Sequence, residues 1–160
     1  MPTPSPMPAE DAFIFEFEEE FVDDLHCIPM AVRFKLDTCG IKLKLAQWNQ
    51  FSQEEREQFI FQPCTSEDEI ADYREFLKDL IFMYSETEAS EIPVAENPPW
   101  LDISVIPPAL VTKAQDHDIP LSLQQWQNLT PLQRFALIKL SRPSHESKNF
   151  LPALQEFELI

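Results

Sequence analysis

The clearest helical pattern in the chain lies between two polar segments near its middle. From Ile70 to Tyr84 the apolar residues recur at spacings of three and four, which places them on one face of a helix. The preceding residues 66–69 (SEDE) form a capping box, and their acidic groups favour the positive end of the helix dipole. The pattern predicts a helix over 66–85 whose apolar face consists of Ile70, Tyr73, Phe76, Leu77, Leu80, Ile81 and Tyr84.

Two further helices are predicted from their first residues. The segments 52–55 (SQEE) and 130–133 (TPLQ) each place Ser or Thr three residues before Glu or Gln, which is the sequence of a capping box. We expect helices to begin there and to run to about Phe61 and Leu140, since a proline follows each of these residues closely.

Each of these helices is preceded by a second predicted helix, over 29–38 and over 107–117. Gly40, the single glycine of the chain, follows the first, where a helix commonly ends in a left-handed residue, and Asp118 occupies the corresponding place after the second. Residues 41–45 alternate apolar and charged side chains, which fits either a short extended segment or a helical turn.

An internal repeat relates these helices. A shift of 78 residues brings 41–48 (IKLKLAQW) onto 119–126 (IPLSLQQW), with five of eight positions identical. Such self-similarity indicates a repeated supersecondary unit, here about 28–64 and 106–142.

The same shift also pairs Trp48 with Trp126 and Arg56 with Arg134. We interpret both pairs as packing residues of the repeated unit, although the arginines could also present a recognition surface.

The remaining segments complete a mostly α fold. Residues 1–11 are rich in proline and predicted to be disordered, and the proline-rich segment 86–108 is a crossover without regular elements. Residues 12–21 fit a β-strand or an extended segment, and 151–159 fit a short helix or an extended tail. We therefore predict a single-domain helical bundle over 12–160 with an extended N-terminal segment.

The charge of the chain is strongly negative and unevenly distributed. With 12 basic and 28 acidic residues the net charge is -16, and residues 65–102 alone hold eleven acids against two bases. This field repels phosphate backbones, so nucleic acids are not expected partners, and a basic protein surface is a better complement.

The expected location is the cytoplasm. The chain contains no apolar stretch long enough to cross a membrane and does not begin with an export signal. Its three cysteines, an odd number at irregular spacings, do not form a disulfide framework and fit a reducing compartment.

No catalytic constellation is evident in the sequence. One glycine cannot build a phosphate-binding loop, and neither G-x-S-x-G nor H-E-x-x-H is present, so we predict neither an enzyme nor a bound cofactor. Cys27, Cys39 and Cys64 could bind zinc or an iron–sulfur cluster, but they form no C-x-x-C pair. We interpret them as small buried apolar residues.

Four segments resemble one protein family. They read FIFEFEEEF at 13–21, CIPMAVRFKLDTCGIKLKLAQW at 27–48, LQQWQNLTPLQRFALIKLSRPSHESKNF at 123–150 and PALQEF at 152–157. With these segments the chain resembles the nitrate reductase associated proteins, which occur with assimilatory nitrate reductase in cyanobacteria and some other bacteria.

The resemblance implies an accessory protein that binds nitrate reductase and serves its maturation, stabilisation or cofactor insertion. It implies no catalytic residues. For a partner-binding surface we select the polar residues in the matched segments that have no evident core role, namely Arg33, Lys35, Asp37, Arg142, His145 and Asn149. Two alternatives remain: a metal or iron–sulfur carrier that uses Cys27, Cys39 and Cys64, and an acidic docking or regulatory module.

Overall fold

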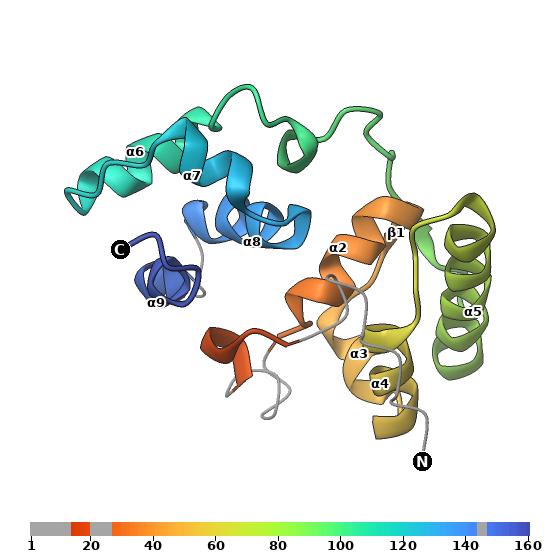
Figure 1. Ribbon diagram of the computed structural model, residues 1–160. Helices are drawn as coiled ribbons and strands as arrows, with labels where there is room; N and C mark the ends of the chain where they lie inside the picture. Colours follow the sequence, from red (N-terminus) through yellow and green to blue (C-terminus); the bar gives the residue numbers. More distant parts are fainter. Residues whose placement is uncertain (1–13, 20–26, 144–146) are drawn as a thin grey trace, which may run out of the picture. The chain divides into compact units, whose positions relative to one another are not determined.

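The computed structural model describes residues 14–19, 27–143 and 147–160. The described chain is mostly helical, as predicted, and its contacts separate into two compact units (Figure 1). Unit 1 extends to Val94, and unit 2 begins at Ala95. The short segment 15–19, although it lies near the start of the chain, belongs to unit 2. The predicted disordered start at 1–11 lies outside the described residues, and the extent of the domain over 12–160 stays a prediction.

The described residues of unit 1 form four helices and a two-stranded antiparallel ladder. Helix α2 follows Pro29, α4 and α5 follow the capping residues Ser52 and Ser66, and the ladder pairs Ile41 with Glu91 and Lys42 with Ser90. The elements are α2 (Met30–Cys39), β1 (Ile41–Lys42), α3 (Leu45–Gln50), α4 (Gln53–Phe61), α5 (Glu67–Ser85) and β2 (Ser90–Glu91). The helices predicted at 52–61 and 66–85 are therefore confirmed, as is the helix that precedes Gly40.

The capping boxes form as the sequence predicts. The hydroxyl of Ser52 accepts a hydrogen bond from the main-chain N–H of Glu55, and the Glu55 carboxylate accepts one from the N–H of Ser52. Ser66 and Glu69 make the same exchange at the start of α5. These bonds satisfy main-chain donors that a helix start leaves unpaired, and so they fix where α4 and α5 begin.

The core of unit 1 is centred on the ring of Phe59, which is fully buried. Its centroid lies 5.3 Å from that of Tyr73 and 4.8 Å from that of Phe76, both on α5. The buried residues of α5 are Tyr73, Leu77, Leu80 and Ile81, which belong to the predicted apolar face.

Gly40 ends α2 in the left-handed conformation, with φ of 77°. Its carbonyl accepts a hydrogen bond from the N–H of Ile92, so the chain beyond β2 runs directly against it. A Cβ at this position would lie 2.8 Å from Cγ2 of Val94 and 2.9 Å from the carbonyl oxygen of Ile92. Both the backbone angle and the available space therefore require glycine.

Unit 2 is organised around α8. The buried residues of α8 are nearly all apolar and lie on almost every side of the helix, as is typical of a central helix. Helix α8 contacts η2, α6 and α9. The elements are η1 (Glu16–Glu18), η2 (Pro99–Leu101), α6 (Pro108–Asp116), α7 (Leu123–Asn128), α8 (Pro131–Ser141), η3 (Ser147–Asn149) and α9 (Phe150–Glu156).

The internal repeat is visible in the secondary structure. Three pairs of helices, α2 and α6, α3 and α7, and α4 and α8, begin 78 residues apart. The repeat also includes the left-handed residue that follows α2. Asp118, which corresponds to Gly40, adopts a left-handed φ of 56°. The predicted repeat of helical units is thus present in the order and register of the elements.

The crossover predicted at 86–108 contains regular structure, contrary to the prediction. The strand β2 precedes the first proline of this segment, and η2 begins at Pro99, whose missing N–H is harmless at the first position of a helical turn. The prolines limit these elements to short lengths but do not prevent them.

At both ends of the chain the sequence left two conformations open, and the structure decides between them. Residues 16–18 form a 3₁₀ turn, not a strand, because the carboxylate of Glu156 accepts hydrogen bonds from the N–H groups of Glu16 and Phe17. The rings of Phe15 and Phe17 pack against Phe157. The C-terminal segment forms the helix α9.

We predict that Gly40→Ala lowers the free energy of unfolding by about 1–3 kcal/mol, because a side chain is strained at positive φ and meets main chain from the segment after β2. The control is Asp118→Gly, which relieves the same left-handed angle at the repeated position and should leave stability unchanged or raise it. Urea unfolding measures both. Wild-type stability of the alanine variant would contradict this account.

Candidate partner-binding surface

Helix α2 carries three of the residues predicted to bind a partner, and the structure separates them. Arg33 and Asp37 are half-buried and lie one helical turn apart, whereas Lys35 is fully buried. The Lys35 ammonium donates hydrogen bonds to the carbonyl oxygens of Ile60, at 2.6 Å, and Phe59, at 3.4 Å. Lys35 therefore serves the interior of unit 1, and a partner could not contact it without movement of α2.

The role of Lys35 follows from the end of α4. The last carbonyls of a helix have no partner within it and carry the negative end of its dipole, so a buried cation is well placed there. Tyr73 completes the arrangement, since its hydroxyl donates to the Phe59 carbonyl at 2.9 Å. A signal for burial was present in the sequence, because Lys35 stands at helical spacing from the apolar residues Val32, Leu36 and Cys39.

The three predicted residues near the C-terminus are also dispersed. Arg142, at the end of α8, is exposed, whereas Asn149, at the start of α9, is buried. His145 lies outside the described residues. The role of Arg33, Asp37 and Arg142 in partner binding stays a prediction.

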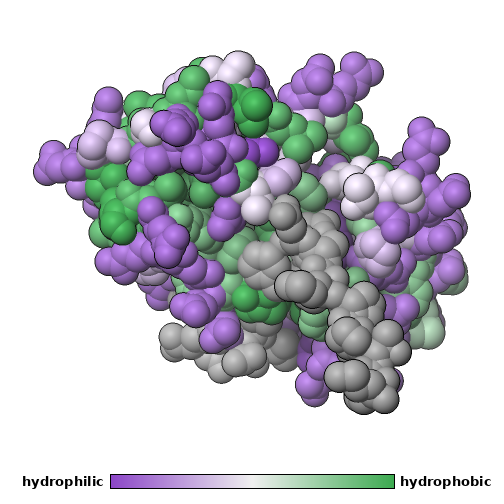
Figure 2. Space-filling view, viewed as in Figure 1, coloured by the Kyte–Doolittle hydropathy of each residue, from purple (hydrophilic) through white to green (hydrophobic). Residues whose placement is uncertain are grey.

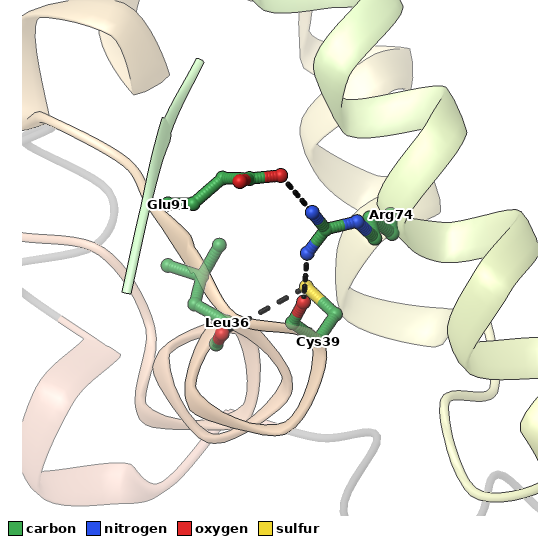
Figure 3. A network of polar contacts seen from close by, with 4 residues as sticks. All are labelled: Leu36, Cys39, Arg74 and Glu91. Atoms are coloured by element: carbon green, nitrogen blue, oxygen red, sulfur yellow. Dashed lines mark hydrogen bonds and ion pairs between the residues drawn. The ribbon is translucent and has the colours of Figure 1, made fainter. Parts of the chain in front are cut away.

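A polar network that the sequence did not reveal joins α2, α5 and β2 (Figure 3). One guanidinium nitrogen of Arg74 donates to the carbonyl oxygen of Cys39 at 2.6 Å, and the other pairs with the carboxylate of Glu91. Arg74 thus binds the last carbonyl of α2 and holds the ladder strand β2 beside α5. Sequence spacing could not indicate this contact, because the three residues are far apart in the chain.

None of the three cysteines forms a disulfide, and all three are buried in unit 1. Burial raises the pKa of Cys39 to about 11, and its thiol points to the carbonyl oxygen of Leu36, 3.7 Å away. The sulfur of Cys64 lies 4.0 Å from the carbonyl oxygen of Lys35. A cysteine binds a metal ion as its thiolate, which the raised pKa of Cys39 disfavours, and no group of three potential ligands occurs within 14–19, 27–143 and 147–160.

In unit 2 the repeated arginine and tryptophan hold the crossover segment. Arg134 is buried, and its guanidinium donates to the carbonyl oxygens of Trp100 and Leu129, each at 2.6 Å. The indole N–H of Trp126 donates to the carbonyl oxygen of Asp102 at 2.9 Å. Burial lowers the pKa of Arg134, but an arginine remains charged at neutral pH. The interpretation of Arg134 and Trp126 as packing residues of the repeated unit is therefore confirmed.

The corresponding pair in unit 1 differs. Arg56 is half-buried, and no hydrogen-bond acceptor faces the buried indole N–H of Trp48 in the part of the chain that the structure describes. The ring of Trp48 packs against Phe51 at a centroid distance of 6.2 Å. In unit 2, Arg134 and Trp126 thus bind main-chain carbonyls of the crossover segment, an arrangement here called the Trp126 clasp. In unit 1, Trp48 contributes through the packing of its ring.

Comparison with known proteins gives one match. The family model of the conserved nitrate reductase-associated proteins covers residues 14–157, almost the whole chain. The chain belongs to the nitrate reductase-associated protein family. No curated protein and no solved structure matches it.

Membership confirms the resemblance seen in the sequence, and the family's description associates its members with nitrate reductase. It assigns no residue to binding. Among the described residues no helix is long and apolar enough to cross a membrane.

We predict that Lys35→Met lowers the free energy of unfolding by about 2–4 kcal/mol, because the carbonyls of Phe59 and Ile60 lose a buried donor. Lys113→Met is the matched control at the repeated position, where the lysine is half-buried, and it should cost less than about 1 kcal/mol. Equal losses in urea unfolding would show that the buried ammonium does not support unit 1.

We predict that Trp126→Phe destabilises the protein by about 0.5–1.5 kcal/mol more than Trp48→Phe does. Both changes remove the same ring volume from a buried site, but only the first leaves a main-chain carbonyl, that of Asp102, without its donor. Thermal or urea unfolding of the two variants measures the difference. An equal effect would contradict the proposed role of the Trp126 clasp.

We predict that the Cys39 thiol of the native protein reacts with iodoacetamide at pH 8 at least about 100-fold more slowly than in urea, since both burial and the raised pKa suppress the thiolate. Because its pKa is raised from 9.0 to about 11, its contribution to stability is complete below pH 9 and is lost as the pH rises through 11. Cys39→Ala should therefore lose less stability over this range. Fast native labelling of Cys39, located by mass spectrometry, would refute the prediction.

Proposed function

We propose that this protein is an accessory factor that binds nitrate reductase and supports formation of the active enzyme, without catalysing a reaction itself. The observation that carries the proposal is the family match over residues 14–157. The family is described by its association with the reductase, and the proposal interprets this association as direct binding.

The structure supports a binding role through its surface chemistry. Carboxylates are concentrated in residues 67–91 of unit 1, with nine acids against two bases, and large apolar side chains are exposed on the same segment, namely Phe82 and Met83. Exposed apolar groups of this size on ordered segments favour protein contacts. The buried thiols, which form no disulfide, fit the proposed cytoplasmic location.

The test is a pull-down of nitrate reductase from the same source with the immobilised full-length protein. The reductase is presented in a cofactor-free form and in a cofactor-loaded form, and an unrelated protein of similar size and negative charge serves as the control bait. We expect capture by this protein and not by the control, with preference for the cofactor-free reductase if the protein acts during assembly.

Equal capture of both forms would indicate a stabilising subunit in place of an assembly factor. Capture of neither form at low salt, where electrostatic association is strongest, would contradict the proposed function.

A further inference from the structure

The outer face of α5 carries side chains that the core of unit 1 does not use. The buried residues of this helix lie on the opposite side, at Tyr73, Leu77, Leu80 and Ile81. The outer face follows the same spacings of three and four, and hydrophilic side chains dominate its visible surface (Figure 2). Its exposed residues include Asp68, Asp72, Glu75 and Asp79, here called the acidic stripe, followed by Phe82 and Met83, the apolar end.

Helix stability does not account for the acidic stripe. Asp68 lies in the first turn, where a carboxylate favours the helix dipole, but Glu75 and Asp79 lie beyond it. Like charges at these spacings repel one another, and the last turn of α5 contains no basic residue. The arrangement opposes folding, so a reason for it must be sought outside the helix.

The stripe is also not neutralised within the described chain. Arg74, one of the two bases of α5, is directed to Glu91 and to the carbonyl of Cys39. None of the four stripe carboxylates has an ion-pair partner in the part of the chain that the structure describes. Their full charge therefore faces solvent.

The apolar end is held in place on an ordered helix. Phe82 and Met83 are 57% and 59% exposed, although they follow directly on the buried residues Leu80 and Ile81. The next residue fixes this last turn, because the Tyr84 ring packs on Phe51 and its hydroxyl donates to Glu55 at 2.7 Å. Two large apolar groups thus remain in water without contributing to the core, which marks a contact surface.

We propose that the acidic stripe and apolar end of α5 form the surface that docks nitrate reductase, through a partner surface that carries a row of Lys or Arg beside an apolar patch. This inference rests on the proposed function and assigns its location. Charge complementarity selects the partner, because a second copy of this chain would bring like charges together and a phosphate-bearing surface would be repelled.

The test compares variants of the full-length protein in binding to purified nitrate reductase at low and high salt. The stripe variant is D72N/E75Q/D79N, and its matched control E96Q/D116N/E158Q removes the same number of exposed charges elsewhere. The apolar variant is F82S/M83S, with Leu101→Ser and Ile103→Ser combined as the control in unit 2. Thermal unfolding of every variant accompanies the binding data.

We expect the stripe variant to bind about tenfold more weakly, with a flatter salt dependence and with a melting temperature equal to or above that of the wild type. The apolar variant should bind about tenfold more weakly while keeping the wild-type salt dependence. Both controls should bind within about twofold of the wild type.

Two results would overturn the inference while leaving the proposed function intact. In the first, the wild type binds and the α5 variants bind equally well. In the second, the stripe variant and its control weaken binding equally, so that only net charge matters. Absence of binding by the wild type at low salt would instead contradict the proposed function, and the inference with it.

Discussion

The arrangement of helices in unit 1 depends on hydrogen bonds that a buried ammonium and a buried hydroxyl make with the end of α4. Lys35 comes from α2 and Tyr73 from α5, and both donate to the Phe59 carbonyl. These bonds satisfy helix-end carbonyls that would otherwise be buried without partners, at a cost of about 1–3 kcal/mol for each. They also set the rotation of α5, because Tyr73 must point inward. The outward direction of its acidic stripe follows from this constraint.

Unit 2 solves the same problem with a different residue of the repeat. Arg134 is the buried cation, and it donates to the carbonyls of Trp126 and Leu129 at the end of α7. The repeat mates of the two cations, Lys113 for Lys35 and Arg56 for Arg134, are half-buried. The units thus share their order of helices, while each fixes its interior with its own cation. Repetition of the sequence therefore does not imply repetition of the polar contacts.

The local part of this structure could be predicted from the sequence, because its causes are local. Capping residues such as Ser52 and Ser66 set the helix starts, and Gly40 sets the end of α2. The contacts of Lys35, Arg74 and Arg134 could not be predicted, since each joins a side chain to main-chain carbonyls of another element, and main-chain acceptors leave no trace in residue identity. Helical spacing can thus indicate that Lys35 is buried, but not which carbonyls its ammonium binds.

The sequence indicates that the candidate site binds a protein, but not where on the molecule the site lies. Composition indicated an acidic protein with a protein partner, and the motifs indicated the family, which the family match confirms. Helical spacing already leaves Phe82 and Met83 off the predicted apolar face of this helix, and the structure shows both exposed, but nothing in the sequence marks this end of α5 as a contact surface. Of the six residues selected from the sequence, Lys35 and Asn149 are buried.

The central claim is that nitrate reductase requires this protein to become active. The most direct measurement is nitrate reductase activity in crude extract of a strain that lacks the gene, with the reductase protein quantified by immunoblot and the gene restored on a plasmid as the control. The account predicts that activity per amount of reductase falls sharply and returns with the wild-type gene. Normal activity in the deletion strain would contradict it.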